Sequence, residues 1–312
     1  MSSILATTES ARARSERGQL AVALAAVAWS TAGVLQRQLS VDVAMQVAGR
    51  ALFAAVAVSA YVALTERGRV LAACRSVGGA GVGFAACVAI SSASFIVALN
   101  HASVAQVLFI QAISPMLAAL LGRGLLGERL SARTTLAMVV ALVGVGVMVG
   151  SPGGGSALGD GLAVLMALGF AVAIVIARHR RDVSMAPATA LAQLMLVVAV
   201  MPVALAGGGH VGLANALWLA VFGAGQIGVG LILLTIGARL IPAAQVALIS
   251  LLEVVLGPLW VWLAVNERPS LATVVGGAIV VAAVVLQARA PMPSPRAGPA
   301  EPGAVEAEHL PR

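Results

Sequence analysis

Apolar runs of about twenty residues recur along most of the chain, separated by short segments of polar, charged or glycine residues. An α-helix needs about 20 mainly apolar residues to cross roughly 30 Å of membrane hydrocarbon, so each run is long enough for one crossing. We therefore predict an all-α, polytopic membrane protein with ten transmembrane helices. The predicted spans are residues 18–36, 44–64, 77–99, 102–122, 133–151, 159–177, 185–206, 212–237, 243–265 and 271–288.

Composition supports this prediction and narrows the class of function. The chain is 60% hydrophobic and 10% charged, which leaves too little polar surface for a soluble globular domain. Its net charge of +7 would suit a nucleic-acid-binding protein, but aromatic residues make up only 4% and the basic residues do not cluster with them. The chain has no lysine, only arginine, which fits the GC-rich coding of some bacteria. Cys74 and Cys87 lack metal-ligand spacing, so we expect neither a metal nor another cofactor.

The arginines also indicate the orientation of the chain, because positively charged loops stay on the cytoplasmic side. With both termini in the cytoplasm, only Arg37 and Arg268 fall on the outer side, and only Arg50 falls within a span. Residues 1–17 form a polar cytoplasmic segment without a cleavage site, and the proline-rich tail 289–312 is expected to be disordered. This asymmetry predicts an even number of crossings in the inner membrane of a bacterium.

A shift of 139 positions lays the fourth predicted span and the loop after it onto the ninth span and its loop. The matched positions are Ala105, Gln106, Val107, Glu128, Arg129 and Ser131 with Ala244, Gln245, Val246, Glu267, Arg268 and Ser270. Hydropathy alone would not reproduce the shared Gln and the Glu-Arg-x-Ser segment, so we infer a duplication, with both serines as candidate N-caps. Two repeats, 18–151 and 159–288, flank a turn-rich linker at 152–158. Five helices per repeat force opposite orientations, and inverted repeats are typical of transporters.

Short motifs are spread over nearly the whole chain. They are Trp29-Ser30, residues 98–105 with the sequence ALNHASVA, Ser114-Pro115, residues 126–130 with the sequence LGERL, Gly159-Asp160 and Glu253. Together they resemble the signature of EamA-type proteins in the drug/metabolite transporter superfamily. The chain departs from that signature at Val254, where the family usually has a proline after the carboxylate. The resemblance implies a ten-helix carrier that exports or takes up amino acids or other metabolites.

Two ionisable residues lie deep within the predicted spans, where a charge is costly. Glu253 lies midway along the ninth span and is the only carboxylate that we place in any span, while Arg50 lies about 10 Å from the outer end of the second. As functional residues, Glu253 would bind a proton or a cation and Arg50 would bind a substrate carboxylate. As structural residues, they would form a buried ion pair or separate hydrogen-bonded struts. Both interpretations stay open.

A solute site also needs a few hydrogen-bonding groups within a largely apolar pocket. The candidates inside the predicted spans are Trp29, Ser30, Gln111, Ser114, Pro115 and Gln226. Pro115 is included because a proline leaves the carbonyl group one turn earlier, at Gln111, without its helical partner. The alternative role of these residues is hydrogen bonding between helices. Trp260, near the outer end of the ninth span, is interpreted as an anchor at the membrane interface.

These features favour a secondary active transporter that exports a small amphipathic metabolite by alternating access, with proton coupling through Glu253. A channel-like facilitator is an alternative, although channels usually need polar rings formed by oligomerisation. An intramembrane enzyme is less favoured, because no predicted span holds a nucleophile with a base and the four histidines fall in loops or the tail. The expected partners are the lipid bilayer and a small solute, without nucleic acid, for a monomer or a homodimer.

Overall fold

The computed structural model describes residues 2–126, 132–148, 156–180, 183–208, 211–238, 240 and 243–288. Within these ranges every regular element is a helix. Three predictions fall outside the described residues. They concern the segment 128–131 with its candidate cap Ser131, the linker up to residue 155, and the tail 289–312.

The helices of the first half lie where the apolar runs predict them. They are α1 (Ser2–Ser30), α2 (Ala32–Arg37), α3 (Val43–Glu66), α4 (Val70–Ser76), α5 (Gly78–His101), α6 (Val104–Gln111), α7 (Ser114–Leu126) and α8 (Ala132–Met148). Two features differ from the prediction. Helix α1 begins well before residue 18, and the short α4 lies in a polar connection that has no spanning run, because a helix does not need an apolar sequence outside the membrane.

The second half repeats this order. Its elements are α9 (Ala157–His179), α10 (Ala186–Ala206), α11 (Leu213–Ala220), the π-helix η1 (Val221–Val229), α12 (Gly230–Ala238), α13 (Ala243–Val265) and α14 (Leu271–Ala288). The prediction that Ser270 caps the last helix is confirmed, since its Oγ accepts a hydrogen bond from the Thr273 N–H at 3.1 Å.

Seven helical segments of the described chain are long and apolar enough to cross a membrane. Shorter apolar segments occur in α8, α13 and α14, at residues 135–147, 252–265 and 271–283. Together the ten segments occupy the places of the ten predicted spans. The chain is therefore a multi-pass helical membrane protein, while the count of ten crossings stays a prediction.

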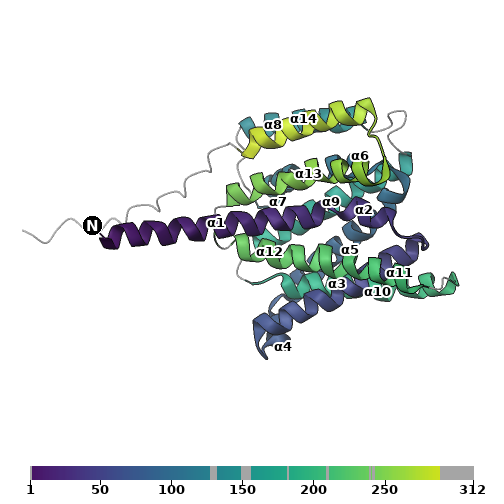
Figure 1. Ribbon diagram of the computed structural model, residues 1–312, viewed down its shortest axis with the longest axis horizontal. Coiled ribbons are helices and arrows are strands. Elements are labelled where there is room, and N and C mark those ends of the chain that lie inside the picture. The colour runs from purple at the N-terminus through teal and green to yellow at the C-terminus, as the bar shows by residue number, and fades with distance from the viewer. Residues whose placement is uncertain are drawn as a thin grey trace, which may run out of the picture.

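The long helices run roughly side by side in one bundle (Figure 1). Helices α8 and α14 form a pair along one edge, and the short α4 lies at the opposite edge. Helix α1 extends far beyond the bundle at its N-terminal end, as the purple ribbon shows. Between the edges, α1 packs against α12, α13 and η1, so that the first helix of one half is surrounded by helices of the other.

The main packing pairs are preserved when the two halves are exchanged. The contact of α5 with α9 corresponds to that of α12 with α1, and the contact of α7 with α9 corresponds to that of α13 with α1. In the same way, the contact of α5 with α10 corresponds to that of η1 with α3. The pairs α3–α10 and α8–α14 map onto themselves. A twofold axis between two inverted repeats produces this pattern.

Three of the spanning segments are interrupted along their length. Helices α1 and α2 meet at Thr31, α6 and α7 meet at residues 112–113, and η1 replaces α-helical geometry at residues 221–229. The π-helical segment packs closely on α3, because a Cβ added at Gly223 would overlap the carbonyl oxygen of Arg50. Irregular helix geometry of this kind is concentrated at functional sites in membrane transporters. The three interruptions therefore indicate where a solute site should lie.

Candidate functional site

Arg50 lies inside the bundle on α3, with only 6% of its surface exposed. Its Nη1 donates a hydrogen bond to the Ser92 hydroxyl of α5 at 3.0 Å, and its Nη2 donates to Oε1 of Gln226 in η1 at 3.1 Å. Its Nε is buried without a hydrogen-bond partner. Buried arginines are usually paired with an acid, so a cation held by neutral groups is an uncommon arrangement.

Two aromatic rings flank the Arg50 guanidinium. Its central carbon lies 4.6 Å from the centre of the Phe222 ring and 5.7 Å from the centre of the Phe95 ring. Both rings are buried, and the face of an aromatic ring attracts a cation. A guanidinium carries five N–H groups, of which Ser92 and Gln226 occupy two. The rings therefore stabilise the charge and leave donor groups for a ligand.

Gln226 connects Arg50 to the break between α1 and α2. Its Nε2 donates a hydrogen bond to the carbonyl oxygen of Trp29 at 3.3 Å. Ser30, which follows Trp29 in the sequence, is fully buried and accepts a hydrogen bond from Nε1 of Trp260 at 3.0 Å. Four predicted site residues thus lie in one polar series across the bundle. The interpretation of Trp260 as an interfacial anchor is wrong, because its N–H group is bonded inside the protein.

Glu253 belongs to a second polar group, at the break between α6 and α7. It is half-buried on α13, and its side chain is hydrogen-bonded to the side chain of Gln111 at the end of α6. The buried Ser114 donates its hydroxyl to the carbonyl oxygen of Gln111 at 2.7 Å. This carbonyl is the one that Pro115 leaves without a helical N–H partner. The polar spot predicted around Gln111 is therefore present.

Arg50 and Glu253 do not form an ion pair. The side-chain partners of Arg50 are Ser92 and Gln226, whereas that of Glu253 is Gln111. Helix α1 packs against both α13, which carries Glu253, and η1, which carries Gln226. The two charged candidates therefore occupy separate sites on either side of the first helix.

Asp160 is a buried carboxylate that was not among the predicted site residues. It is 2% exposed in the first turn of α9 and accepts a hydrogen bond from Nε2 of the fully buried Gln106. The expectation that Glu253 is the only carboxylate within a span is therefore wrong. The signal was present in the Gly159-Asp160 motif, but a position at the start of a predicted helix suggests an acid exposed at the membrane surface.

A salt bridge joins the two halves at one end of the bundle. Nε of Arg37, the last residue of α2, lies 2.9 Å from Oε2 of Glu267, and Oε1 of Glu267 accepts a hydrogen bond from the Val104 N–H at 2.8 Å. Arg37 also donates to the Leu99 carbonyl oxygen at 2.5 Å. Arg37 was expected in an outer loop, and the structure instead places it within a contact that joins α2, α5, α6 and the segment after α13.

A cluster of amides lies next to this salt bridge. Gln36 donates to Gln46 at 3.3 Å and to Asn100 at 3.1 Å, and Asn100 donates to Gln46 at 2.9 Å. Gln36 and Gln46 are buried. These bonds tie α2, α3 and α5 together at the same end of the bundle.

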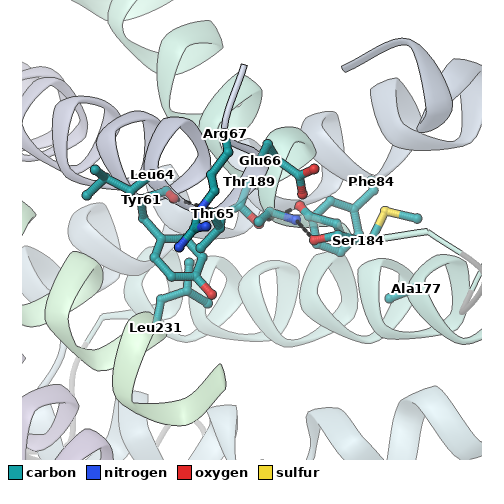
Figure 2. A pocket seen from close by; sticks show the side chains of 12 residues that line it. Tyr61, Leu64, Thr65, Glu66, Arg67, Phe84, Ala177, Ser184, Thr189 and Leu231 are labelled. Carbon is teal, nitrogen blue, oxygen red and sulfur yellow. Dashed lines mark hydrogen bonds between the residues drawn. The ribbon is translucent and has the colours of Figure 1, made fainter. Parts of the chain in front are cut away.

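A cavity of about 710 Å³ lies at the opposite end of α3. It is lined by the ends of α3 and α9 and the starts of α5, α10 and α12. Figure 2 shows Tyr61 and Arg67 on one side of this cavity and Phe84 and Ser184 on the other. Its walls are therefore mixed, with aromatic, hydroxyl and charged groups.

The cavity and the Arg50 site share helices but are separated along them. Tyr61 follows Arg50 by eleven residues on α3, or about 16 Å along the helix axis. Between them α3 packs on η1 so closely that a Cβ at Gly228 would lie 2.7 Å from the Ala57 Cβ.

The arrangement offers an anion site at Arg50 and a carboxyl group at Glu253. Among the residues that the structure describes, no group of three or more His, Cys, Asp or Glu side chains is placed to hold a metal ion. The side chains at these positions can form hydrogen bonds and bind ions.

Comparison with known proteins gives a matching family and a set of similar solved structures. A family model described as the EamA-like transporter family matches the chain twice, at residues 16–150 and 157–289. A solved structure titled "Crystal structure of protein" resembles the chain with a TM-score of 0.60 and 20% sequence identity, over 86% of this chain and 96% of that one. At this identity the likeness shows the fold alone. No curated protein matches the chain.

Proposed function

The chain belongs to the EamA-like transporter family, and from this premise we propose that it exports a small amphipathic solute across a bacterial inner membrane by alternating access. In this proposal ten helices, arranged as inverted repeats at 18–151 and 159–288, cross the membrane with both termini in the cytoplasm. The solute binds between the halves and is exposed first to one side and then to the other.

The observation that carries the proposal is the buried Arg50. A cation at this depth is costly unless a charge or strong hydrogen bonds compensate it. Its protein partners, Ser92 and Gln226, are neutral, and its Nε has no partner. A negatively charged group of the solute supplies the missing compensation, and guanidinium groups suit the planar, bidentate recognition of carboxylates.

The two ends of the bundle fit one state of an alternating cycle. The end with Arg37 and Glu267 is closed, and the opposite end contains the cavity beside Tyr61 and Arg67. With the orientation predicted from the arginines, the cavity faces the cytoplasm, where an exported solute is taken up. Opening the outer end requires the Arg37–Glu267 contact to break.

Glu253 is proposed as the coupling residue. It is half-buried on α13, opposite the interruption at the end of α6, and Gln111 is its hydrogen-bonding partner. A carboxyl group in such a place can bind a proton on one side and release it on the other when the halves move. Its ionised form can instead receive a cationic group of the solute.

Transport by purified protein in proteoliposomes tests the proposal. A carrier gives saturable uptake that is accelerated by unlabelled solute on the opposite side of the membrane, because the loaded site returns faster than the empty one. A channel-like facilitator gives flux without this counterflow. Saturable flux without any counterflow, or wild-type counterflow in Arg50→Gln, would contradict the proposal.

A further inference from the structure

The residues around Arg50 also restrict the chemistry of the solute. We infer, resting on the proposed function of this site, that the solute is a monocarboxylate with a flat apolar body and no ammonium group beside the carboxylate. This class differs from the amino acids that the family resemblance suggested.

The number of negative charges follows from the number of cations. The cation of this site is Arg50, and its two side-chain partners, Ser92 and Gln226, are neutral. One carboxylate uses the free Nε–H together with a neighbouring Nη–H in a bidentate pair. A second negative charge on the solute would be buried among Phe95 and Phe222 without a partner, which is strongly unfavourable.

The apolar body follows from the rings. Phe222 and Phe95 are both buried and lie within 6 Å of the guanidinium, so a group attached to the bound carboxylate meets aromatic surface. Aromatic pairs prefer stacked or edge-to-face contacts, which favour a flat group over a branched or polar one.

The absence of an ammonium group follows from the acceptors near Arg50. In an α-amino acid the ammonium group lies next to the carboxylate, so it would be buried beside the guanidinium. No carboxylate of the described residues lies within 4.0 Å of the Arg50 guanidinium, and the acceptors there, Ser92 and Gln226, are neutral and already bind Arg50. Glu253 belongs to the separate site with Gln111. A second cation at Arg50 would therefore add repulsion without compensation.

Three probes of one shape test this inference. 3-Phenylpropionate carries only the carboxylate, L-phenylalanine carries carboxylate and ammonium, and 2-phenylethylamine carries only the ammonium. Binding of each to the purified full-length protein is measured by calorimetry and by the shift of the melting temperature. We expect 3-phenylpropionate to bind at least about tenfold more tightly than L-phenylalanine, and 2-phenylethylamine not to compete with it.

Variants locate the site without relying on one substitution. Ser92→Ala and Phe222→Leu should each weaken binding of 3-phenylpropionate several-fold, and Arg50→Gln should weaken it by at least about tenfold. Arg75→Gln, at an exposed position on α4, is the matched control and should bind as the wild type does. Because the comparison of the three probes uses the wild-type protein, it stands even where Arg50→Gln does not fold.

The outcomes separate this inference from the proposed function. Equal or tighter binding of L-phenylalanine, or no binding of 3-phenylpropionate, overturns the inference. If L-phenylalanine binds and is transported in an Arg50-dependent way, the proposed function nevertheless stands. If 3-phenylpropionate binds at Arg50 but no probe crosses proteoliposome membranes faster than with empty vesicles, the inference on recognition stands and the transport function falls.

Discussion

Gln226 accepts a hydrogen bond from Arg50 at 3.1 Å and donates one to the carbonyl oxygen of Trp29 at 3.3 Å. The first bond joins the two halves of the chain, and the second reaches the point where the first transmembrane segment is interrupted. Arg50 thus contacts a residue whose other hydrogen bond holds α1. The site and the moving parts of the bundle are connected by one amide, and the following predictions start from it.

Arg50→Gln should reduce solute transport by about 10-fold to 100-fold while the protein still folds. Hydrogen bonds to a charged group contribute about 1.5–3 kcal/mol, which corresponds to such a factor. The fold is expected to tolerate the change, since no protein carboxylate loses its partner. Arg50→Lys keeps the charge but not the planar fork of the guanidinium, so its transport rate should lie between those of the wild type and Arg50→Gln. Initial rates in proteoliposomes and melting curves check this prediction, with Arg75→Gln as control.

Glu253→Gln should make transport independent of pH while leaving the melting temperature nearly unchanged. Gln has the size and hydrogen-bonding capacity of Glu, so the contact with Gln111 is kept, but it cannot bind or release a proton. The control Glu16→Gln removes an exposed acid of α1 and should keep the pH profile of the wild type. An unchanged profile in Glu253→Gln would assign this residue a structural role only.

Glu267→Gln should loosen the closed end of the bundle. It removes the salt bridge to Arg37, whose two side chains are 26% and 23% exposed, and such a partly exposed pair contributes about 1 kcal/mol. Its loss should therefore favour opening of this end by up to about fivefold. A reporter Ala102→Cys, with Cys74→Ser and Cys87→Ala, lies buried next to this contact. Its reaction with an impermeant maleimide should be faster in Glu267→Gln than in the adjacent control Arg268→Gln. Equal rates would show that the salt bridge does not limit opening.

Gly223→Ala should destabilise the protein by about 1–3 kcal/mol. The added Cβ would overlap the carbonyl oxygen of Arg50 and approach the Phe53 Cβ to 2.8 Å, so η1 would have to move away from α3. Gly225 lies in the same π-helical segment, where a Cβ would meet only Val221 at an ordinary 3.7 Å. Gly225→Ala is therefore the matched control, and melting temperatures compare the two. Similar losses in both variants would contradict close packing at Gly223.

Ala157→Cys should react with an impermeant maleimide in intact cells, whereas the native Cys74 should react only after the cells are broken. Ala157 is exposed at the start of α9, and Cys74 is exposed on α4, at the opposite ends of the bundle in the predicted topology. Cys87→Ala removes the remaining thiol. The reverse labelling pattern would invert the proposed orientation.

Hydropathy predicts the positions of the helices because the membrane requires an apolar run for each crossing, and α3, α5, α10, α13 and α14 begin and end within a few residues of the predicted spans. Arg50 could be singled out for the same reason, since its cost in the membrane is readable from its depth. Its lack of a carboxylate partner could not be predicted from the sequence, because that depends on which helices meet.

Other parts of the site left no readable pattern. Arg37 and Glu267 are 230 positions apart, so only the folded bundle reveals their contact. The π-helix could be suspected only from the glycines at 223, 225 and 228, which also suit ordinary close packing. Trp260 shows the same limit, because its position near the end of the helix suits both a place at the membrane surface and a hydrogen bond to Ser30 inside the bundle.

The exchange of halves that maps α3 onto α10 has a consequence for stoichiometry. Arg50 is the eighth residue of α3, and the eighth residue of α10 is Gln193, which is 2% exposed and has an unpartnered Oε1. Counted from the start of each helix, the two positions match, and one carries a charge whereas the other carries a neutral amide. Of these two positions only Arg50 can bind an anion, so we expect each turnover to carry one anion.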